Sequence, residues 1–200
     1  MSTPTTTTEE ADRQDMGRLA AGQESGLAAL MTRHGERLFH YLYRLLQDEE
    51  EAADLAQETF VRVYQHCDRF DRRRKFTTWL YAIATNLARD RARWRSRHPT
   101  VSLQAESAAT GAELHSSLAA GEANPHEALV AEERAGWVRE AIGALPEDLR
   151  APLLLAEYQG LSQADISEVL GCSAKAVELR LYRARQRLRA RLQPLVAQFA

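Results

Sequence analysis

Apolar residues recur at steps of three and four along most of the chain, which is the pattern of amphipathic α-helices. The first such stretch runs from Gly26 to Leu46, and the second follows Asp48, which forms a capping box with Glu51. A third begins near Thr77, which we expect to cap it, and ends before Pro99. No useful length of sequence alternates apolar and polar residues as a β-strand does. The pattern therefore predicts an N-terminal bundle of helices.

The segment from Leu161 to Arg191 has the pattern of a helix-turn-helix. Ser162 precedes a short apolar period as an N-cap, with Asp165 three residues further on. Gly171 supplies the left-handed residue of the turn, and Ser173 is placed to cap the second, longer helix. Upstream, two further helices are separated by a proline, so we predict a compact helical domain in this half of the chain.

Between these two halves the composition changes to Ala, Ser, Gly and Glu with little periodicity. The predicted fold class is all-α: two small helical domains, an N-terminal helical bundle and a C-terminal helix-turn-helix domain, joined by a flexible linker. The Thr-rich and then acidic N-terminus shows no clear apolar period, so we expect it to be disordered. The predicted boundaries are 1–23 for this tail, 24–98 for the first domain, 99–125 for the acidic linker and 126–195 for the second domain.

The second helix of the helix-turn-helix has distinct faces at about 100° per residue. Its buried stripe is predicted to hold Val177, Leu181, Ala184, Leu188, Leu192 and Leu195. The opposite, groove-facing side holds Lys175, Glu178, Leu179, Tyr182, Arg183 and Gln186. From Lys175 to Arg191 there are seven basic residues and a single acid. Beside a helix-turn-helix, this charge favours DNA binding over a merely solvated helix.

The formal net charge of −2 hides a second basic block, since Arg69 to Arg97 contains ten basic residues against two acids. In the helical second half of this block, arginine stands at every other position, which splits the side chains between two opposite sides. Arg89, Arg93 and Arg97 line one side, and Arg91 and Arg95 point the other way. One phosphate ridge needs only one side, which leaves pairing with protein acids as the alternative for part of the set.

The helix after Asp48 carries a polar stripe that includes acids. Its members are Asp54, Gln57, Glu58, Val61 and Gln65. From spacing alone, the simplest interpretation is a solvated acidic face.

Motifs for chemistry are missing from the sequence: there is no P-loop, no GxSxG and no HExxH. We therefore expect neither an enzyme nor a cofactor, and no metal site. The only two cysteines, Cys67 and Cys172, are far apart, which is typical of a reducing compartment. No apolar run approaches a membrane span, and the N-terminus is acidic where a signal peptide is basic and then apolar. We expect a cytoplasmic protein without membrane insertion.

Three motifs in this order resemble the bacterial extracytoplasmic-function sigma factors of the sigma-70 family. They are DLAQETFVRVYQ, KFTTWLYAIATNLARD, and the segment from ALPEDLR through the helix-turn-helix, together spanning about Gly26 to Leu192. The resemblance implies that the acidic stripe docks on the clamp helices of the largest subunit of RNA polymerase, which replaces the simpler interpretation. The implied docking residues are Asp54, Gln57, Glu58 and Val61.

The resemblance also implies two promoter-reading surfaces. The loop and helix after Cys67 would recognise the minus-ten element as a melted single strand, for which aromatic or amide groups hold bases and cations hold the backbone. The implied base-contacting residues are Phe70, Asn86 and Arg89, and the implied backbone-contacting residues are Arg72, Arg73, Arg74, Lys75, Arg93 and Arg97.

The helix-turn-helix would read the minus-thirty-five element as duplex in the major groove. The implied residues are Ser173, Lys175, Glu178, Leu179, Arg180, Tyr182, Arg183, Gln186 and Arg187. The sequence departs from the common family pattern at Glu178 and Leu179, where many members have a basic residue followed by a small polar one. Glu178 either accepts from a cytosine or pairs with Lys175 or Tyr182 and reads nothing.

The expected partners are core RNA polymerase (the clamp helices and the flap), promoter DNA and an anti-sigma factor. The expected function is promoter-specific transcription initiation. The first alternative is a helix-turn-helix regulator that acts without polymerase docking, and the second is an adaptor that binds no DNA.

Overall fold

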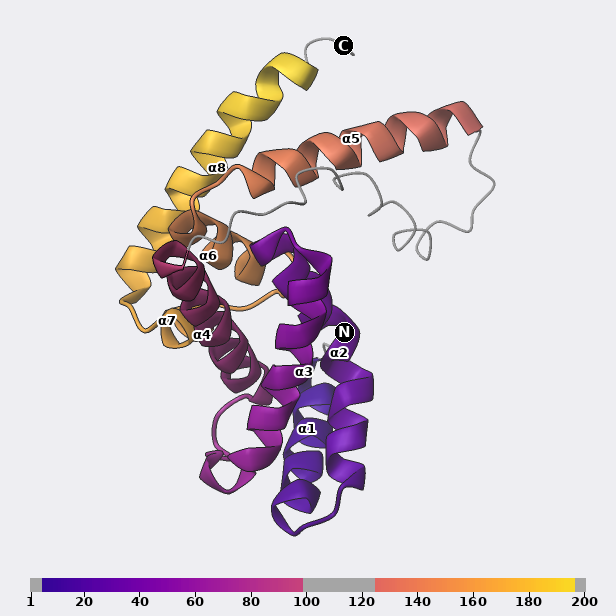
Figure 1. The fold of residues 1–200 in the computed structure, drawn as a ribbon, viewed down its shortest axis with the longest axis vertical. Helices are drawn as coiled ribbons and strands as arrows, with labels where there is room; N and C mark the ends of the chain where they lie inside the picture. Colours follow the sequence, from indigo (N-terminus) through magenta and orange to yellow (C-terminus); the bar gives the residue numbers. More distant parts are fainter. Residues whose placement is uncertain (1–4, 99–124, 197–200) are drawn as a thin grey trace.

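The computed structural model describes residues 5–98 and 125–196, and every regular element in these ranges is a helix (Figure 1). The N-terminal part holds α1 (Thr5–Ala20), α2 (Ser25–Leu46), α3 (Glu49–Gln65), the short 3-10 helix η1 (Cys67–Arg69) and α4 (Phe76–Arg97). The C-terminal part holds α5 (Pro125–Gly143), α6 (Glu147–Glu157), α7 (Gln163–Leu170) and α8 (Ala174–Val196). The predicted all-α fold in two helical parts is confirmed for these ranges. Of the predicted linker, residues 99–124 lie outside them.

The hairpin of α2 and α3 forms the centre of the N-terminal bundle. Leu38, Leu42 and Val63 are fully buried, and burying a side chain of this size stabilises the fold by about 2 kcal/mol. Asp48 caps α3 by accepting a hydrogen bond of 2.9 Å from the backbone N–H of Glu51, as predicted. The predicted cap of α4 is wrong: this helix begins at Phe76, one residue before Thr77, and no side chain caps it.

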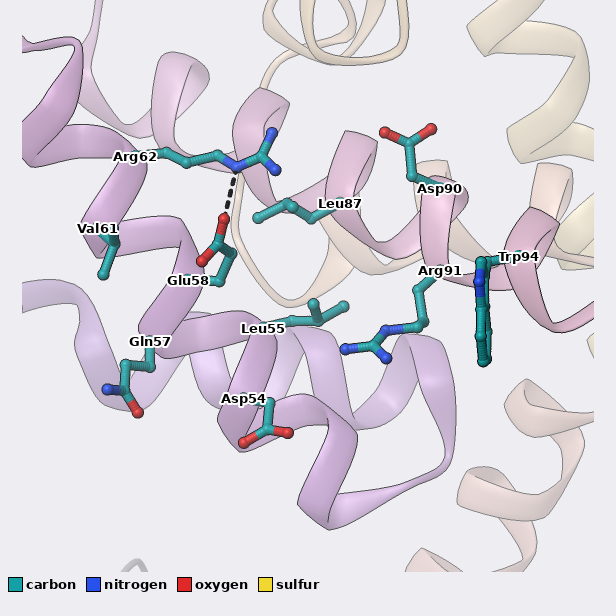
Figure 2. Close-up of a pocket in the computed structure, with 10 residues that line it drawn as sticks. All are labelled: Asp54, Leu55, Gln57, Glu58, Val61, Arg62, Leu87, Asp90, Arg91 and Trp94. Atoms are coloured by element: carbon teal, nitrogen blue, oxygen red, sulfur yellow. Dashed lines mark hydrogen bonds and ion pairs between the residues drawn. The ribbon is translucent and has the colours of Figure 1, made fainter. Parts of the chain in front are cut away.

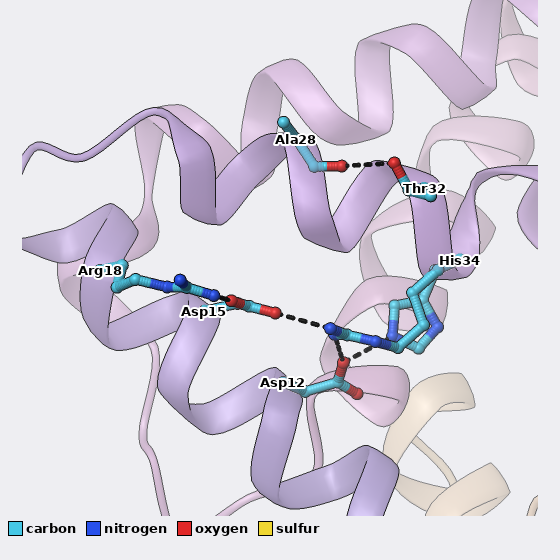
Figure 3. A network of polar contacts seen from close by, with 7 residues as sticks. Asp12, Asp15, Arg18, Ala28, Thr32 and His34 are labelled. Atoms are coloured by element: carbon cyan, nitrogen blue, oxygen red, sulfur yellow. Dashed lines mark hydrogen bonds and ion pairs between the residues drawn. The ribbon is translucent and has the colours of Figure 1, made fainter.

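The prediction of a disordered tail over residues 1–23 is wrong for residues 5–20, which form α1. Met16 and Leu19 are buried against α2. The acids Asp12 and Asp15 are also buried, at 1% exposure each, and they pair across the interface with α2 (Figure 3). The tail has few apolar residues because much of its buried face is ionic, and for this reason its periodicity is weak in the sequence.

The partners of these acids lie on α2. Arg33 donates hydrogen bonds to both carboxylates, and His34 Nε2 lies 2.8 Å from Asp12 Oδ1. Burial would raise the pKa of Asp15, but the hydrogen bonds from Arg33 and Arg18 outweigh it, and the pKa lies below its ordinary value. His34 is 6% exposed, so the expectation of a core histidine is confirmed.

The C-terminal part is a helical domain built on the predicted helix-turn-helix. Ser162 and Asp165 form the capping box of α7, and Gly171 ends this helix in the left-handed region at φ 62°. Ser173 Oγ accepts from the backbone N–H of Ala176 and so caps α8. One predicted core residue is misplaced, because Val138 of α5 is 37% exposed.

The two parts pack on each other and share one continuous apolar core. In Figure 1, α7 lies beside α4, and α6 lies beside the end of α2, as their residue contacts also show. Polar contacts reinforce this packing: the Tyr81 hydroxyl donates to Gln159 at 2.6 Å, and Arg150 donates to the carbonyl of Leu45 at 2.7 Å. The relative placement of the domains is therefore held by specific contacts.

Candidate functional surfaces

A groove of about 600 Å³ lies between α3 and α4 (Figure 2). All four residues of the predicted docking stripe line it: Asp54, Gln57, Glu58 and Val61. Their spacing along α3 puts them on one face. Val61 is 40% exposed although it is apolar, and Glu58 is held by Arg62 at 2.9 Å. An exposed apolar residue beside acidic groups suits a partner with a basic, partly apolar surface.

The second wall of the groove comes from α4 and was not predicted. It consists of Leu87, Asp90, Arg91 and Trp94. Trp94 is half exposed and stacks on His98 with ring centroids 5.0 Å apart. The spacing of Leu87, Arg91 and Trp94 places them on one helix face, which is the signal that could have identified this wall.

The inner end of this region contains a buried carboxylate with two arginines. Arg95 lies 2.9 Å from Glu51 Oε2, in a geometry that makes an ion pair without a hydrogen bond, and Arg91 lies 3.6 Å from Oε1. Burial raises the pKa of Glu51 and outweighs the lowering by Arg95. The alternative of pairing with protein acids is therefore confirmed for Arg91 and Arg95.

The basic loop between η1 and α4 is organised by Asp71. This carboxylate accepts from the backbone N–H of Arg73 at 3.0 Å and from its guanidinium at 3.1 Å. The side-chain hydrogen bond from Arg73 lowers the pKa of Asp71. Arg74 N–H closes the turn on the Asp71 carbonyl at 2.9 Å. Arg72 reaches Gly17 of α1, where an added methyl group would meet its guanidinium at 3.5 Å. The loop is thus a defined turn.

Phe70 is placed differently from the other predicted minus-ten residues. It is only 9% exposed and packs on Trp79, with ring centroids 5.1 Å apart, and edge-on against Phe76 at 6.2 Å. Phe76 in turn contacts His34 at 5.3 Å. In this conformation Phe70 belongs to an aromatic cluster under the loop, and it offers little surface to a base.

The remaining minus-ten candidates lie along α4. Asn86 and Arg97 are exposed. Arg93 lies 3.3 Å from Asp90, in the next turn of the same helix. Arg89 lies 3.9 Å from Glu147, at the start of α6 in the other domain. These residues surround the side of α4 that faces the C-terminal domain.

Two cations of the loop also contact the C-terminal domain. Arg74 donates to Glu168, and Lys75 Nζ lies 3.0 Å from Asp165 Oδ2. The hydrogen bond from Asp165 raises the pKa of Lys75. Burial would raise the pKa of Asp165, but the hydrogen bonds from Ser162 and Lys75 outweigh it, so this pKa lies below its usual value. The structure thus brings the minus-ten cations to the helix-turn-helix, which the sequence did not predict.

The predicted minus-thirty-five surface is open on α8. Val177, Leu181 and Ala184 are buried, as predicted. The exposed set comprises Ser173, Lys175, Glu178, Leu179, Tyr182, Arg183, Gln186 and Arg187.

Two contacts order this surface. Arg180 is half-buried and contacts Cys172 Sγ at 3.4 Å, and Gln186 donates to the Tyr182 hydroxyl at 2.7 Å. Within the described residues, Glu178 makes no hydrogen bond or ion pair with Lys175 or Tyr182. Glu178 is thus presented to solvent.

Metal binding finds no support in residues 5–98 and 125–196, where no cluster of three or more His, Cys, Asp or Glu side chains is arranged to hold an ion. Among the helices in those ranges, none combines the length and the apolarity needed to cross a membrane.

Two family models match the chain. The model of sigma-70 region 2 matches residues 30–98, and the model of sigma-70 region 4 matches residues 135–188. The first match covers the acidic groove and the basic loop, and the second covers the helix-turn-helix.

Similar proteins agree with these matches. The ECF RNA polymerase sigma factor SigW of Bacillus subtilis is 36% identical over 175 residues, which cover 87% of this chain and 92% of SigW. The RNA polymerase sigma-H factor of Pseudomonas aeruginosa is 34% identical over 94% of this chain and 97% of its own. The structure of CnrH in complex with the cytosolic domain of CnrY superposes with a TM-score of 0.66 at 29% identity, covering 92% of this chain and 98% of CnrH.

Proposed function

Because this chain belongs to the extracytoplasmic-function (ECF) sigma factors of the sigma-70 family, we propose that its three surfaces bind core RNA polymerase and two promoter elements. The observation that carries this proposal is the groove between α3 and α4, which gathers all four residues of the predicted docking stripe beside the basic loop. An ordinary helix-turn-helix regulator has no use for this combination.

The docking surface is assigned to Asp54, Gln57, Glu58 and Val61, and its partner is the clamp helices of the largest polymerase subunit. Glu58 and Asp54 supply charge that steers a basic partner, and Val61 supplies apolar area at the centre. The flap of the polymerase is the expected partner of the C-terminal domain. The two domains correspond to residues 24–98 and 126–195.

The minus-ten surface is assigned to the loop and to α4, as a site for melted single strand. Arg72, Arg73, Arg74, Lys75, Arg93 and Arg97 bind phosphates, and Asn86 and Arg89 contact bases. Phe70 supports the loop from below, since its ring lies in the aromatic cluster; it contacts a base only if that cluster rearranges.

The minus-thirty-five surface is assigned to the N-terminal half of α8 in the major groove of duplex DNA. The side chains that face the groove are those of Lys175, Glu178, Leu179, Tyr182, Arg183 and Gln186. Ser173, Arg180 and Arg187 lie at its edges and serve the phosphates. Glu178 and Leu179 give this surface a base preference of its own.

We further propose that the protein works in the cytoplasm, without catalysing a reaction itself, and that an anti-sigma factor holds it inactive. CnrH, at 29% identity, is known in complex with the cytosolic domain of CnrY. Purification from the native host under non-inducing conditions should recover such a partner, and recovery of the protein alone would count against it.

Reconstituted transcription tests the main proposal. Run-off transcripts from a genomic promoter library should require both core polymerase and this protein, and their absence would refute the assignment. Val61→Glu should weaken core binding at least about tenfold, because it places a charge at the apolar centre of the interface. Met31→Glu is the matched control, since Met31 is equally exposed, at 44%, but lies outside the groove.

A gel shift separates the alternative of an independent regulator. Such a regulator binds its duplex tightly by itself, whereas we expect weak duplex binding here until core polymerase is added.

A further inference from the structure

The cations of the minus-ten surface are partly occupied by carboxylates of the same chain. Arg74 pairs with Glu168, Lys75 with Asp165 at 3.0 Å, and Arg89 lies 3.9 Å from Glu147. All three acids belong to the C-terminal domain, and all three cations belong to the N-terminal domain. The acids therefore stand where phosphates of a bound strand would have to stand.

These ion pairs lie at the edge of a built interface. Thr78 Oγ1 donates to Asp165 at 3.3 Å, and the buried Tyr81 hydroxyl donates to Gln159 at 2.6 Å. Next to them, the Arg44 guanidinium lies 4.5 Å from the ring centre of Tyr158. Isolated surface ion pairs hold little by themselves, but here they add to buried hydrogen bonds and a shared apolar core. The interface is therefore specific enough to define a closed state.

The other two surfaces stay open in the same conformation. The docking groove is lined by α3 and α4 alone, and its Val61 is 40% exposed. On α8, Leu179 is 48% exposed and Tyr182 is 59% exposed. The contact between the domains thus masks one of the three surfaces and spares the docking surface.

We propose that α7 acts as an internal competitor of the minus-ten strand, with Asp165 and Glu168 closing the basic loop until core polymerase separates the two domains. The proposal rests on the function assigned above, and it deepens the minus-ten site by adding its regulation. Because the docking groove is accessible in the closed state, binding of polymerase comes first and single-strand binding second. DNA and the C-terminal domain then exclude each other on Arg74 and Lys75.

Conservative variants of full-length protein test this competition without polymerase. Glu168→Gln removes the partner of Arg74, and Glu168 takes no part in the capping box of α7. Asp165→Asn weakens the pair with Lys75 while an amide oxygen remains available for the cap. Glu133→Gln on α5 is the control, since it removes the same charge from an exposed site away from the loop.

The probe is a fluorescein-labelled oligothymidylate, because the masked cations bind backbone and not a particular base. By fluorescence anisotropy, Glu168→Gln should bind about two- to fivefold more tightly than wild type, which is the range of a surface ion pair. The double variant Asp165→Asn/Glu168→Gln should bind more tightly still, and Glu133→Gln should match wild type. Equal binding by the double variant and wild type would overturn the proposal.

Small-angle scattering gives a readout that does not depend on DNA. The double variant should have a larger radius of gyration than wild type at the same salt concentration, and an unchanged radius would also overturn the closed state. Transcription by the reconstituted holoenzyme distinguishes the two levels. If closure is refuted while transcription persists, the proposed function stands, whereas failure of transcription with intact closure refutes the function alone.

Discussion

At the scale of single residues, the docking groove depends on a side chain from its second wall. Trp94 is half exposed, stacks on His98 and faces the acidic stripe across the groove. We expect Trp94→Ala to weaken binding of core polymerase about tenfold, because a large aromatic at the centre of an interface contributes more than its neighbours. Titration of labelled core polymerase measures this affinity.

The control for Trp94→Ala is Tyr64→Ala, which removes an aromatic of similar exposure, 51%, from outside the groove. Equal affinity of the two variants would show that the α4 wall does not contact polymerase.

Glu178 is the residue at which promoter preference should differ from that of related proteins. Its side chain is exposed, and Tyr182 is engaged by Gln186 instead. If Glu178 accepts a hydrogen bond from a cytosine, Glu178→Lys should change the preferred base at one position of the minus-thirty-five element, by about 1–3 kcal/mol. Selection from a randomised promoter library with holoenzyme measures the preference. Gln193→Lys, near the end of α8, adds a charge away from the groove, and a uniform gain in both variants would mean that Glu178 reads no base.

At the scale of elements, α1 depends on buried ion pairs. The pKa of Asp15 is lowered in the folded protein, so this carboxylate stabilises the fold above its unfolded pKa of about 3.8, and the contribution is lost as pH falls through the folded value. We expect Asp15→Asn to cost about 2 kcal/mol of unfolding free energy at neutral pH, less than a fully buried pair, because Arg18 and Arg33 are partly exposed. Urea unfolding at several pH values measures this difference.

The difference between Asp15→Asn and wild type should shrink below about pH 3.8, where wild type also loses the charge. Glu10→Gln, exposed on the same helix, should have little effect at any pH. A cost that did not vary with pH would mean that the ion pair does not stabilise α1.

Elements with local signals could be predicted from the sequence. The caps at Ser162 and Asp48, the turn at Gly171 and the buried stripe of α8 follow from neighbouring residues, so these predictions were right. The order of α1 could not be predicted, because it depends on Arg33 and His34 in another helix.

The candidate site shows the same division. The docking stripe lies on one helix and was placed by its period, but its opposite wall at Trp94 requires knowledge of how α4 packs on α3. The burial of Phe70 and the pairing of Arg74 with Glu168 are also set by tertiary contacts, over distances in sequence that no local pattern reports.

At the scale of the whole molecule, one guanidinium ties the ends of two helices from different domains. Arg150 donates to the carbonyl of Leu45 at 2.7 Å, near the end of α2, and to those of Gly143 and Leu145 around the end of α5. These carbonyls have no partner within their own helix, so a cation there satisfies them and opposes the helix dipole. Burial lowers the pKa of Arg150, yet a guanidinium stays charged at any ordinary pH.

Because the two domains share one core, wild type should unfold in a single calorimetric transition. Arg150→Met keeps the apolar stem but removes the three carbonyl contacts, which should cost about 2 kcal/mol and uncouple the domains. We expect two transitions in differential scanning calorimetry, the first of them from the C-terminal domain. Arg134→Met, on the exposed side of α5, should keep the single transition. If Arg150→Met also melted in one step at the wild-type temperature, Arg150 would not couple the domains, and the closed state would have to depend on α4 and α7 alone.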